Sequence, residues 1–150
     1  WPKKTNNIDG CYDVVATSMK VTKDYIQYGL GFKTEIPDGY EGIIRPRSSN
    51  SKYDLVMCNS IATMDAGYRG EWLVRFKVVF PATLMYYLDH IQASDEEVEE
   101  ALEKWVPTVY AVGDKVAQIC FRKLEDATYT LVGSLEESSR GEGGFGSTGK

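Results

Sequence analysis

Residues 72–80 have the sequence WLVRFKVVF, and their alternating pattern indicates the fold class. Large apolar side chains stand at every second position from Trp72 to Phe80, and Arg75 and Lys77 fall between them. A period of two over this length predicts a β-strand with one buried face and one partly polar face. We therefore expect residues 72–80 to form a strand that faces a hydrophobic core.

Other apolar and β-branched stretches on both sides of residues 72–80 also favour strands. They are residues 42–47, 53–58, 116–121 and 128–135. Turn-forming sequences separate them: Pro37-Asp38-Gly39, the serine-rich residues 48–51, Ala66-Gly67 and Gly113-Asp114. Many short strands with frequent turns predict an all-β protein, built as a distorted β-barrel or a sandwich.

One stretch departs from the strand pattern. Ser94 stands three positions before Glu97, the spacing of a capping box, and acidic residues fill the first turn. Apolar residues then recur at helical spacing until Pro107 ends the pattern: Val98, Ala101, Leu102 and Trp105. This pattern predicts one short amphipathic helix at 94–105 with an acidic outer face.

Composition limits the class of protein. A length of 150 residues, 43% hydrophobic and 26% charged, is typical of one globular domain over residues 1–150. We expect no membrane partner, because apolar runs of membrane-spanning length and a signal-peptide pattern are absent. The net charge of −5 gives no general attraction for nucleic acid. Three widely spaced cysteines, Cys11, Cys58 and Cys120, predict buried free thiols and a cytoplasmic location.

The final stretch, 140–150, has the composition of a mobile arm that binds anions. It contains five glycines in eleven residues, one arginine, two hydroxyl side chains and one aromatic ring. Glycine lets backbone N–H groups approach a phosphate, and the Arg140 guanidinium matches phosphate oxygens. Phe145 offers a face on which a base can stack. A solvated terminus without function is the alternative reading of the same composition.

Three further segments carry polar residues that are ambiguous when each is taken alone. In residues 59–71, two short β segments around Ala66-Gly67 predict a hairpin with Asp65 and Tyr68 at its mouth. Asp65 there is either a general base toward water or part of an ordinary turn. Arg47 with its two following serines either binds phosphate or faces water. Gln118, a lone amide among apolar strand residues, needs hydrogen-bond partners of some kind.

Taken together and in order, these segments resemble the five motifs of the homotrimeric, all-β deoxyuridine triphosphatase (dUTPase) family. The motifs correspond to residues 10–16, 46–49, 59–71, 113–119 and 140–149. The third and fifth are long and specific. The resemblance implies a distorted, jelly-roll-like barrel with a flexible glycine-rich arm at 140–150. It also implies hydrolysis of dUTP to dUMP and pyrophosphate by water attack on the α-phosphorus, as in dUMP biosynthesis, in a homotrimer whose active sites are shared between subunits.

The resemblance also implies roles for individual residues. Asp65 activates the attacking water, Tyr68 packs under the deoxyribose, and Asn59 lies in the segment that reads uracil. Asp13 holds Mg²⁺ through water. The phosphate chain is bound by Arg47, Ser48, Ser49 and Gln118, and the arm closes over the nucleotide with Arg140, Phe145, Gly146, Ser147 and Thr148. Such positioning by donors and a cation is what phosphoryl displacement requires.

Some positions depart from the family pattern and leave alternatives open. Cys11, Ser49 and Ala62 replace common glycines, and residues 81–107, with the predicted helix, are an insertion that supplies no motif. Deoxycytidine triphosphate deaminases, some of them bifunctional, share the fold and related segments. Some phage members of the family carry an insertion at a similar place and act as regulators through protein contacts. The exposure of Val98, Leu102 and Trp105 distinguishes a docking helix from a structural cap.

Overall fold

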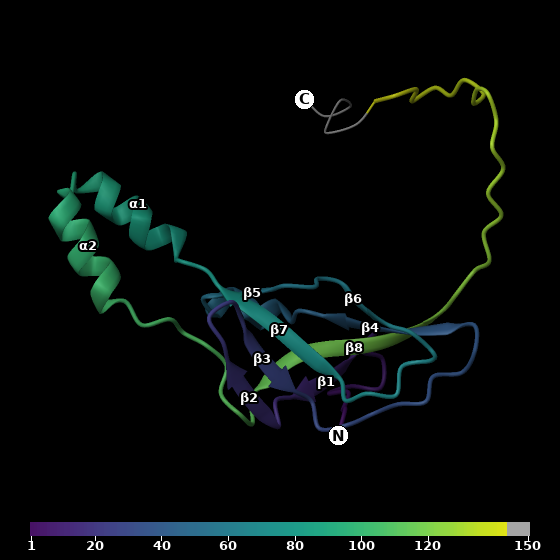
Figure 1. Cartoon of the computed structure of the whole chain (residues 1–150), viewed down its shortest axis with the longest axis horizontal. Helices are drawn as coiled ribbons and strands as arrows, with labels where there is room; N and C mark the ends of the chain where they lie inside the picture. Colours follow the sequence, from purple (N-terminus) through teal and green to yellow (C-terminus); the bar gives the residue numbers. More distant parts are fainter. Residues whose placement is uncertain (144–150) are drawn as a thin grey trace.

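A computed structural model describes residues 1–143, in which eight strands form two four-stranded antiparallel sheets (Figure 1). The first sheet has the order β1 (Tyr12–Val15), β8 (Lys115–Lys123), β4 (Tyr40–Arg45) and β6 (Ala62–Met64). The second has the order β2 (Ser18–Val21), β3 (Ile26–Gly29), β7 (Leu73–Val78) and β5 (Leu55–Met57). A 3₁₀ helix, η1 (Ser48–Lys52), links the two sheets after β4. The all-β prediction is confirmed.

The hydrophobic core lies between the two sheets and is rich in aromatic rings. Tyr28 and Tyr110 are fully buried, and their rings meet edge to face at 6.1 Å. The Tyr28 hydroxyl donates a 2.9 Å hydrogen bond to the Tyr110 carbonyl oxygen, which satisfies its polar end inside the core. Burial raises the pKa of Tyr28 to about 12, so this hydroxyl stays protonated and remains a donor.

The strand predicted at 72–80 is confirmed over Leu73–Val78. Trp72, Val74 and Phe76 are buried, as the period of two predicts. Val78 is 41% exposed, because the chain there leaves the core and runs toward the helices. The strands predicted at 42–47, 53–58 and 116–121 are present as β4, β5 and β8, with ends that shift by up to two residues.

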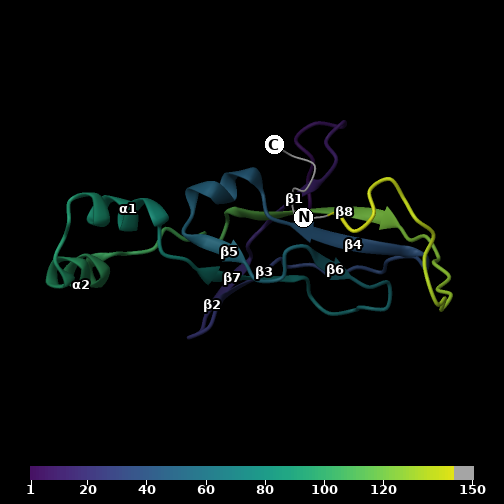
Figure 2. The same ribbon diagram turned by 90° about the horizontal axis from the view of Figure 1, so that it is seen from above.

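Residues 81–105 form a hairpin of two helices, α1 (Ala82–His90) and α2 (Asp95–Lys104), where one was predicted. The predicted capping box of α2 is present: the Ser94 side chain accepts from the Glu97 N–H, and Glu97 accepts from the Ser94 N–H. Figures 1 and 2 show both helices beyond one end of the sheets. α2 contains no buried residue along its described length, and Leu102 is 43% exposed. The Trp105 ring packs against Phe80 at 4.7 Å.

The predictions of a strand at 128–135 and of buried cysteines are wrong. Residues 128–135 form no strand within the described part of the chain, and Tyr129, Leu131 and Leu135 are almost fully exposed. A strand needs a partner, and residues 1–143 provide none for this segment. The cysteines are not fully buried either: Cys58 is exposed, and Cys11 and Cys120 are partly exposed.

No helix among the described residues is long and apolar enough to span a membrane.

Candidate active site

Three of the predicted motifs meet at the edge of the first sheet, around one carboxylate. Asp13 on β1 lies opposite Gln118 on β8. Arg47 follows β4 and donates a 2.8 Å hydrogen bond from Nε to Asp13 Oδ1, while Lys115 Nζ lies 2.9 Å from Oδ2. Arg47 Nη1 also donates to the Ser49 hydroxyl at 2.9 Å. We call these five residues the β1–β8 cluster.

The charges of the β1–β8 cluster favour the ionised form of Asp13 and give the cluster a net positive charge. Burial alone raises the pKa of Asp13, but hydrogen bonds from Lys115 and Arg47 outweigh it and hold the pKa below its ordinary value. One negative and two positive side chains leave a net charge of about +1. Lys115 is 48% exposed and can move without loss of core packing. The cluster can therefore receive an anion in an otherwise acidic protein.

Gln118 and the two serines have defined surroundings. Gln118 Nε2 donates to the Pro46 carbonyl oxygen at 3.0 Å, so the amide that required a partner has one, and it is fixed toward the segment that carries Arg47. Ser48 is exposed and begins η1, where its carbonyl oxygen accepts from the Ser51 hydroxyl. The Ser49 hydroxyl thus stands beside the Arg47 guanidinium just beyond the end of β4, and Ser48 lies between these two residues in the sequence.

The segment 59–71 is a crossing loop between sheets, which corrects the predicted hairpin. β6 pairs with β4 in the first sheet, whereas β7 pairs with β3 and β5 in the second. Asp65 and Tyr68 nevertheless share one turn, since the Tyr68 N–H donates to the Asp65 carbonyl oxygen at 3.0 Å. The Tyr68 hydroxyl donates to the Glu71 carbonyl oxygen at 2.9 Å. Both side chains are exposed to solvent.

A cavity of about 310 Å³ opens beside this loop, where β5, β6 and β7 come together. Its walls are mostly apolar and include Asn59, Cys58 and Arg75 as polar groups; Met57, Ala62, Met64, Leu73 and Val74 complete the lining. A mostly apolar cavity with a few polar groups is typical of a site for a small organic group. We call it the β5–β7 cavity.

The β1–β8 cluster and Asp65 stand at different ends of the first sheet. Gly42 of β4 pairs with Met64, so Asp65 lies near the level of Glu41. Arg47 is six positions farther along, which corresponds to roughly 20 Å at 3.3 Å per residue. Within one chain, the structure therefore does not bring the predicted base together with the predicted phosphate-binding residues.

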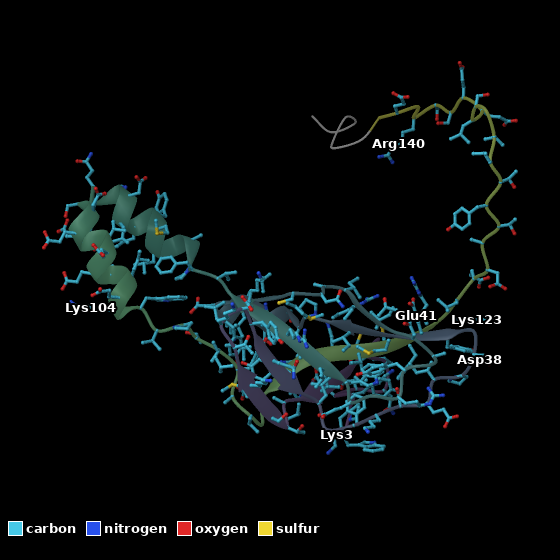
Figure 3. The ribbon with its side chains drawn as sticks, viewed as in Figure 1. Lys3, Asp38, Glu41, Lys104, Lys123 and Arg140 are labelled. Carbon is cyan, nitrogen blue, oxygen red and sulfur yellow. The ribbon has the colours of Figure 1, made fainter. Side chains whose placement is uncertain are left out.

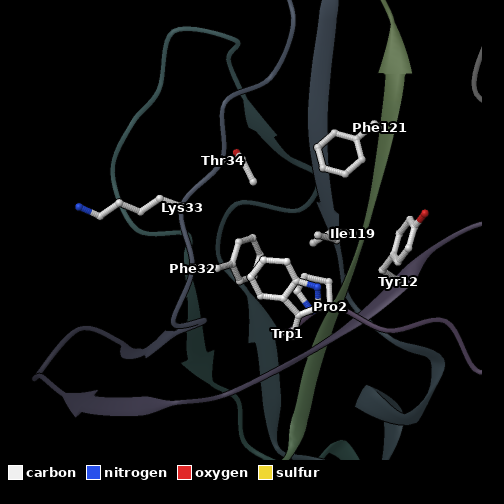
Figure 4. A pocket seen from close by; sticks show the side chains of 8 residues that line it. All are labelled: Trp1, Pro2, Tyr12, Phe32, Lys33, Thr34, Ile119 and Phe121. Atoms are coloured by element: carbon white, nitrogen blue, oxygen red, sulfur yellow. The ribbon is translucent and has the colours of Figure 1, made fainter.

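A second cavity, of about 180 Å³, is distinct from these groups (Figure 4). It lies under the N-terminal residues and is lined chiefly by the rings of Trp1, Tyr12, Phe32 and Phe121. The Lys33 side chain extends away from these rings. The cavity contains none of the residues that the sequence predicted for the site.

The arm is described only in part. Arg140 lies on the extended C-terminal segment, well away from the sheets (Figure 3), and its Nε donates to the Gly143 carbonyl oxygen at 2.9 Å. The predicted residues Phe145, Gly146, Ser147 and Thr148 lie outside residues 1–143.

Sequence reasoning missed Lys115 and Glu71. Lys115 contacts Asp13 across 102 positions of sequence, and the pairing of β1 with β8 is needed to see it. The Glu71 carboxylate accepts a 2.9 Å hydrogen bond from the Gly31 N–H and ties the base of the 59–71 loop to the end of β3. Gly31 has a φ of +71°, a conformation in which glycine is favoured. The glycine at position 31 is the sign of this turn that the sequence offers.

No protein-family model matches the chain, whereas curated proteins do. The deoxyuridine 5'-triphosphate nucleotidohydrolase of Thermobifida fusca is 35% identical over 120 residues, which are 79% of this chain and 54% of that protein. That of Finegoldia magna is 33% identical over 120 residues, which are 79% of this chain and 67% of the relative. The chain therefore spans between about half and two thirds of the length of these relatives.

Solved structures share the fold. A dUTPase of Staphylococcus bacteriophage 80alpha, described with dUPNHPP and as one of the phage dUTPases that control transfer of virulence genes, gives a TM-score of 0.67 at 20% identity. The match covers 100% of this chain and 92% of that one. A mutant dUTPase from phage phi11 of S. aureus, described with a structural Mg(II) ion, gives a TM-score of 0.61 at 19% identity and covers 91% and 92%.

The curated relatives confirm the resemblance drawn from the five motifs. Identity of 33% over 79% of this chain and 67% of a relative shows that the chain belongs to the deoxyuridine 5'-triphosphate nucleotidohydrolase (dUTPase) family.

Proposed function

We propose that this chain hydrolyses dUTP to dUMP and pyrophosphate by attack of water on the α-phosphorus. Family membership supports the activity. The observation that carries the assignment to these residues is the contact of Asp13 with Arg47, together with the pairing of Asp13 with Gln118, because it joins three separate motifs in one place.

The β1–β8 cluster is proposed to bind the triphosphate. Arg47 supplies a planar guanidinium that matches two phosphate oxygens, and Ser48, Ser49 and Gln118 add neutral donors beside it. Lys115 adds a second cation. Donors fixed before the substrate arrives lower the barrier where charge develops in the transition state, which is the main demand of phosphoryl transfer.

Mg²⁺ is the cofactor that fits this donor set. Among the described residues, no group of three or more metal-ligating side chains gathers, so a cage made only of protein is not expected here. A single ionised carboxylate, Asp13, suits a cation that keeps most of its water and takes substrate oxygens as further ligands. When bound, Mg²⁺ neutralises charge on the phosphate chain. Asp13 would hold it through water, and Lys115 would have to give up its contact.

The 59–71 loop is proposed to bind the nucleoside and to supply the base. Asn59 lines the β5–β7 cavity, whose apolar walls suit a pyrimidine ring. Tyr68 presents an exposed ring of which the hydroxyl is already held by Glu71, so the ring can pack against deoxyribose. Asp65 is solvent-exposed and can accept a proton from the attacking water.

We propose that the complete site is shared between copies of the chain in a homotrimer. The separation of roughly 20 Å between Asp65 and Arg47 along β4 is too long for one nucleotide site within a chain. A neighbouring copy that presents its β1–β8 cluster to the 59–71 loop removes this gap. The exposed apolar segment 128–135 also favours contact with another copy. The arm, with Arg140, Phe145, Gly146, Ser147 and Thr148, would then close over the bound nucleotide.

The activity is tested by measuring pyrophosphate release from ribo- and deoxynucleoside triphosphates with and without Mg²⁺. The proposal expects turnover of dUTP alone among them, with strong dependence on Mg²⁺. dCTP belongs in the same panel, with ammonia measured in parallel. Ammonia release from dCTP would establish the deaminase, or the bifunctional enzyme, in place of a strict dUTPase.

A second candidate function, regulation of another protein, is favoured by the helical hairpin. α1 and α2 lie outside the sheets, and Tyr86, Tyr87 and Leu102 are 72%, 58% and 43% exposed. Six carboxylates on α2 give the hairpin a strong negative charge. Replacing residues 82–104 by a short Gly-Ser linker separates catalysis from regulation. The shortened chain should still turn over dUTP. If the hairpin is regulatory, the shortened chain should no longer bind a partner protein that the intact chain captures.

We also propose a cytoplasmic location. Cys11, Cys58 and Cys120 are all free thiols. Thiols that stay unpaired in a folded protein are typical of a reducing compartment. Fractionation of the source cells followed by the dUTP assay tests this, and activity recovered only outside the cytoplasm would contradict it.

A further inference from the structure

Cys11 directly precedes β1, and Cys120 lies on β8, the neighbouring strand of the first sheet. The β1–β8 pairing ends with Tyr12 opposite Ile119, so Cys11 and Cys120 are the next residues of the two segments beyond the last paired position. Both thiols are free and partly exposed. Burial and the neighbouring Cys120 thiol raise the pKa of Cys11 above its ordinary value. The two residues are far apart in sequence, and only the pairing of the strands brings them together.

Their geometry suits a covalent link. Residues that lie directly opposite in an antiparallel pair have Cα atoms about 4.5 to 5.5 Å apart. A disulfide requires a Cα separation of about 4.4 to 6.8 Å. At the spacing of the adjoining β1–β8 ladder, the two positions fall within the range that a disulfide requires.

The thiol pair also lies beside the β1–β8 cluster. Side chains two positions apart on a strand point to the same face, so Cys120 shares a face with Gln118 on β8. Cys11 lies two positions before Asp13 in the sequence. The separation along each strand is about 7 Å. A link at this point would fix the start of β1, which carries Asp13, to β8, which carries Lys115 and Gln118.

We propose that Cys11 and Cys120 form a redox-active thiol pair that closes reversibly into a disulfide by exchange with a small-molecule disulfide such as glutathione disulfide. One thiolate attacks the reagent and releases one glutathione thiol. The second thiolate attacks the resulting mixed disulfide and releases the other. Two electrons pass from the protein to the reagent, and the two cysteine protons end on the released thiols or in solvent.

The test uses the full chain with Cys58→Ser, which removes the exposed thiol as a source of links between molecules. The protein is incubated with glutathione disulfide, blocked with N-ethylmaleimide and measured by mass spectrometry. We expect a loss of about 2 Da, no maleimide uptake and a peptide that joins residues 11 and 120. Dithiothreitol should restore both thiols. The oxidised form should melt about 5 °C or more above the reduced form, because the link closes a long loop.

Two matched variants, Cys58→Ser with Cys11→Ser and Cys58→Ser with Cys120→Ala, should take up a single glutathione and show no such rise in melting temperature. The proposal is overturned if the folded Cys58→Ser protein keeps two free thiols under conditions that oxidise the unfolded chain. Stable glutathione adducts on both cysteines, or dimers linked through them, would also overturn it. None of these readouts depends on dUTP turnover. A negative result here would therefore leave the proposed function unaffected, and loss of the proposed function would leave this inference unaffected.

Discussion

Arg47 and Asp13, from two different motifs, are joined by a 2.8 Å hydrogen bond between Nε and Oδ1. The bond ties the end of β4 to β1 across β8, the strand between them. Because Lys115 occupies the other carboxylate oxygen, Asp13 is held by two cations in the chain without substrate. The proposed metal-binding residue and the proposed phosphate-binding arginine therefore depend on each other for position.

Asp13→Asn should lower stability in a pH-dependent way. The pKa of Asp13 is lower in the folded than in the unfolded chain. Its ion pairs therefore stabilise the fold fully at pH values above the ordinary pKa of a carboxyl group, and this stabilisation is lost as the pH falls through the folded pKa. At neutral pH we expect a loss of about 1–2 kcal/mol in urea unfolding. The difference from wild type should shrink toward pH 3 or below. Exposed Asp126→Asn is the control, and an equal loss at all pH values would refute the ion-pair account.

Tyr68→Ala should narrow the preference for dUTP over UTP, because the ring would no longer fill the space that a 2′-hydroxyl needs. Tyr68→Phe keeps the ring and loses only the bond to the Glu71 carbonyl oxygen, so it should keep most of the preference. The measurement is kcat/KM for both nucleotides. Equal losses for dUTP and UTP in the alanine variant would show that Tyr68 has only a structural role.

Trp105→Ala should lower the melting temperature by a few degrees while kcat for dUTP stays nearly unchanged. The ring contact between Trp105 and Phe80 anchors the hairpin to the end of β7 and is worth about 1 kcal/mol. Leu102→Ala removes an exposed side chain of α2 and should change little. A collapse of kcat in a folded Trp105→Ala protein would mean that the hairpin takes part in the active site.

Truncation after Leu135 should leave a folded protein with strongly reduced turnover. The arm supplies Arg140 and the residues proposed to cover the nucleotide, and ordering a glycine-rich segment is favourable only when phosphate charge compensates its entropy. Truncation after Gly143 keeps Arg140 and removes the rest, so it separates the arginine from Phe145, Ser147 and Thr148. Full activity in the shorter truncation product would exclude a closing arm.

The features that the sequence predicted correctly depend on local contacts. The capping box of α2 joins residues three positions apart, and the alternation in β7 is written in one short stretch. α1 was missed because it begins after Pro81 with no side-chain cap and places Tyr86 and Tyr87 on its exposed surface. Its apolar residues therefore do not form the stripe by which a buried helix is recognised.

The features that were missed or wrongly predicted depend on distant parts of the chain. Lys115 reaches Asp13 only through the pairing of β1 with β8. Residues 128–135 do have the sequence pattern of a strand, but a strand forms only when another strand is available to pair with it. For the same reason, the loop 59–71 was read as a hairpin, since nothing local reveals that β6 and β7 belong to different sheets.

The most direct test of a site shared between copies is to mix two inactive variants. Asp65→Asn should reduce turnover by about 10²–10⁴-fold, and Arg47→Ala should also be nearly inactive through loss of phosphate binding. The two variants are mixed in equal amounts, unfolded together and refolded. If the site is shared, about one quarter of wild-type activity should return, because random assortment of chains pairs an intact Asp65 with an intact Arg47 in about one quarter of the sites. Asp65→Asn mixed with Tyr68→Ala, both on the 59–71 loop, should recover nothing beyond the activities of the two variants. Absence of recovery from the first mixture, with mixed oligomers confirmed by native mass spectrometry, would contradict the shared site.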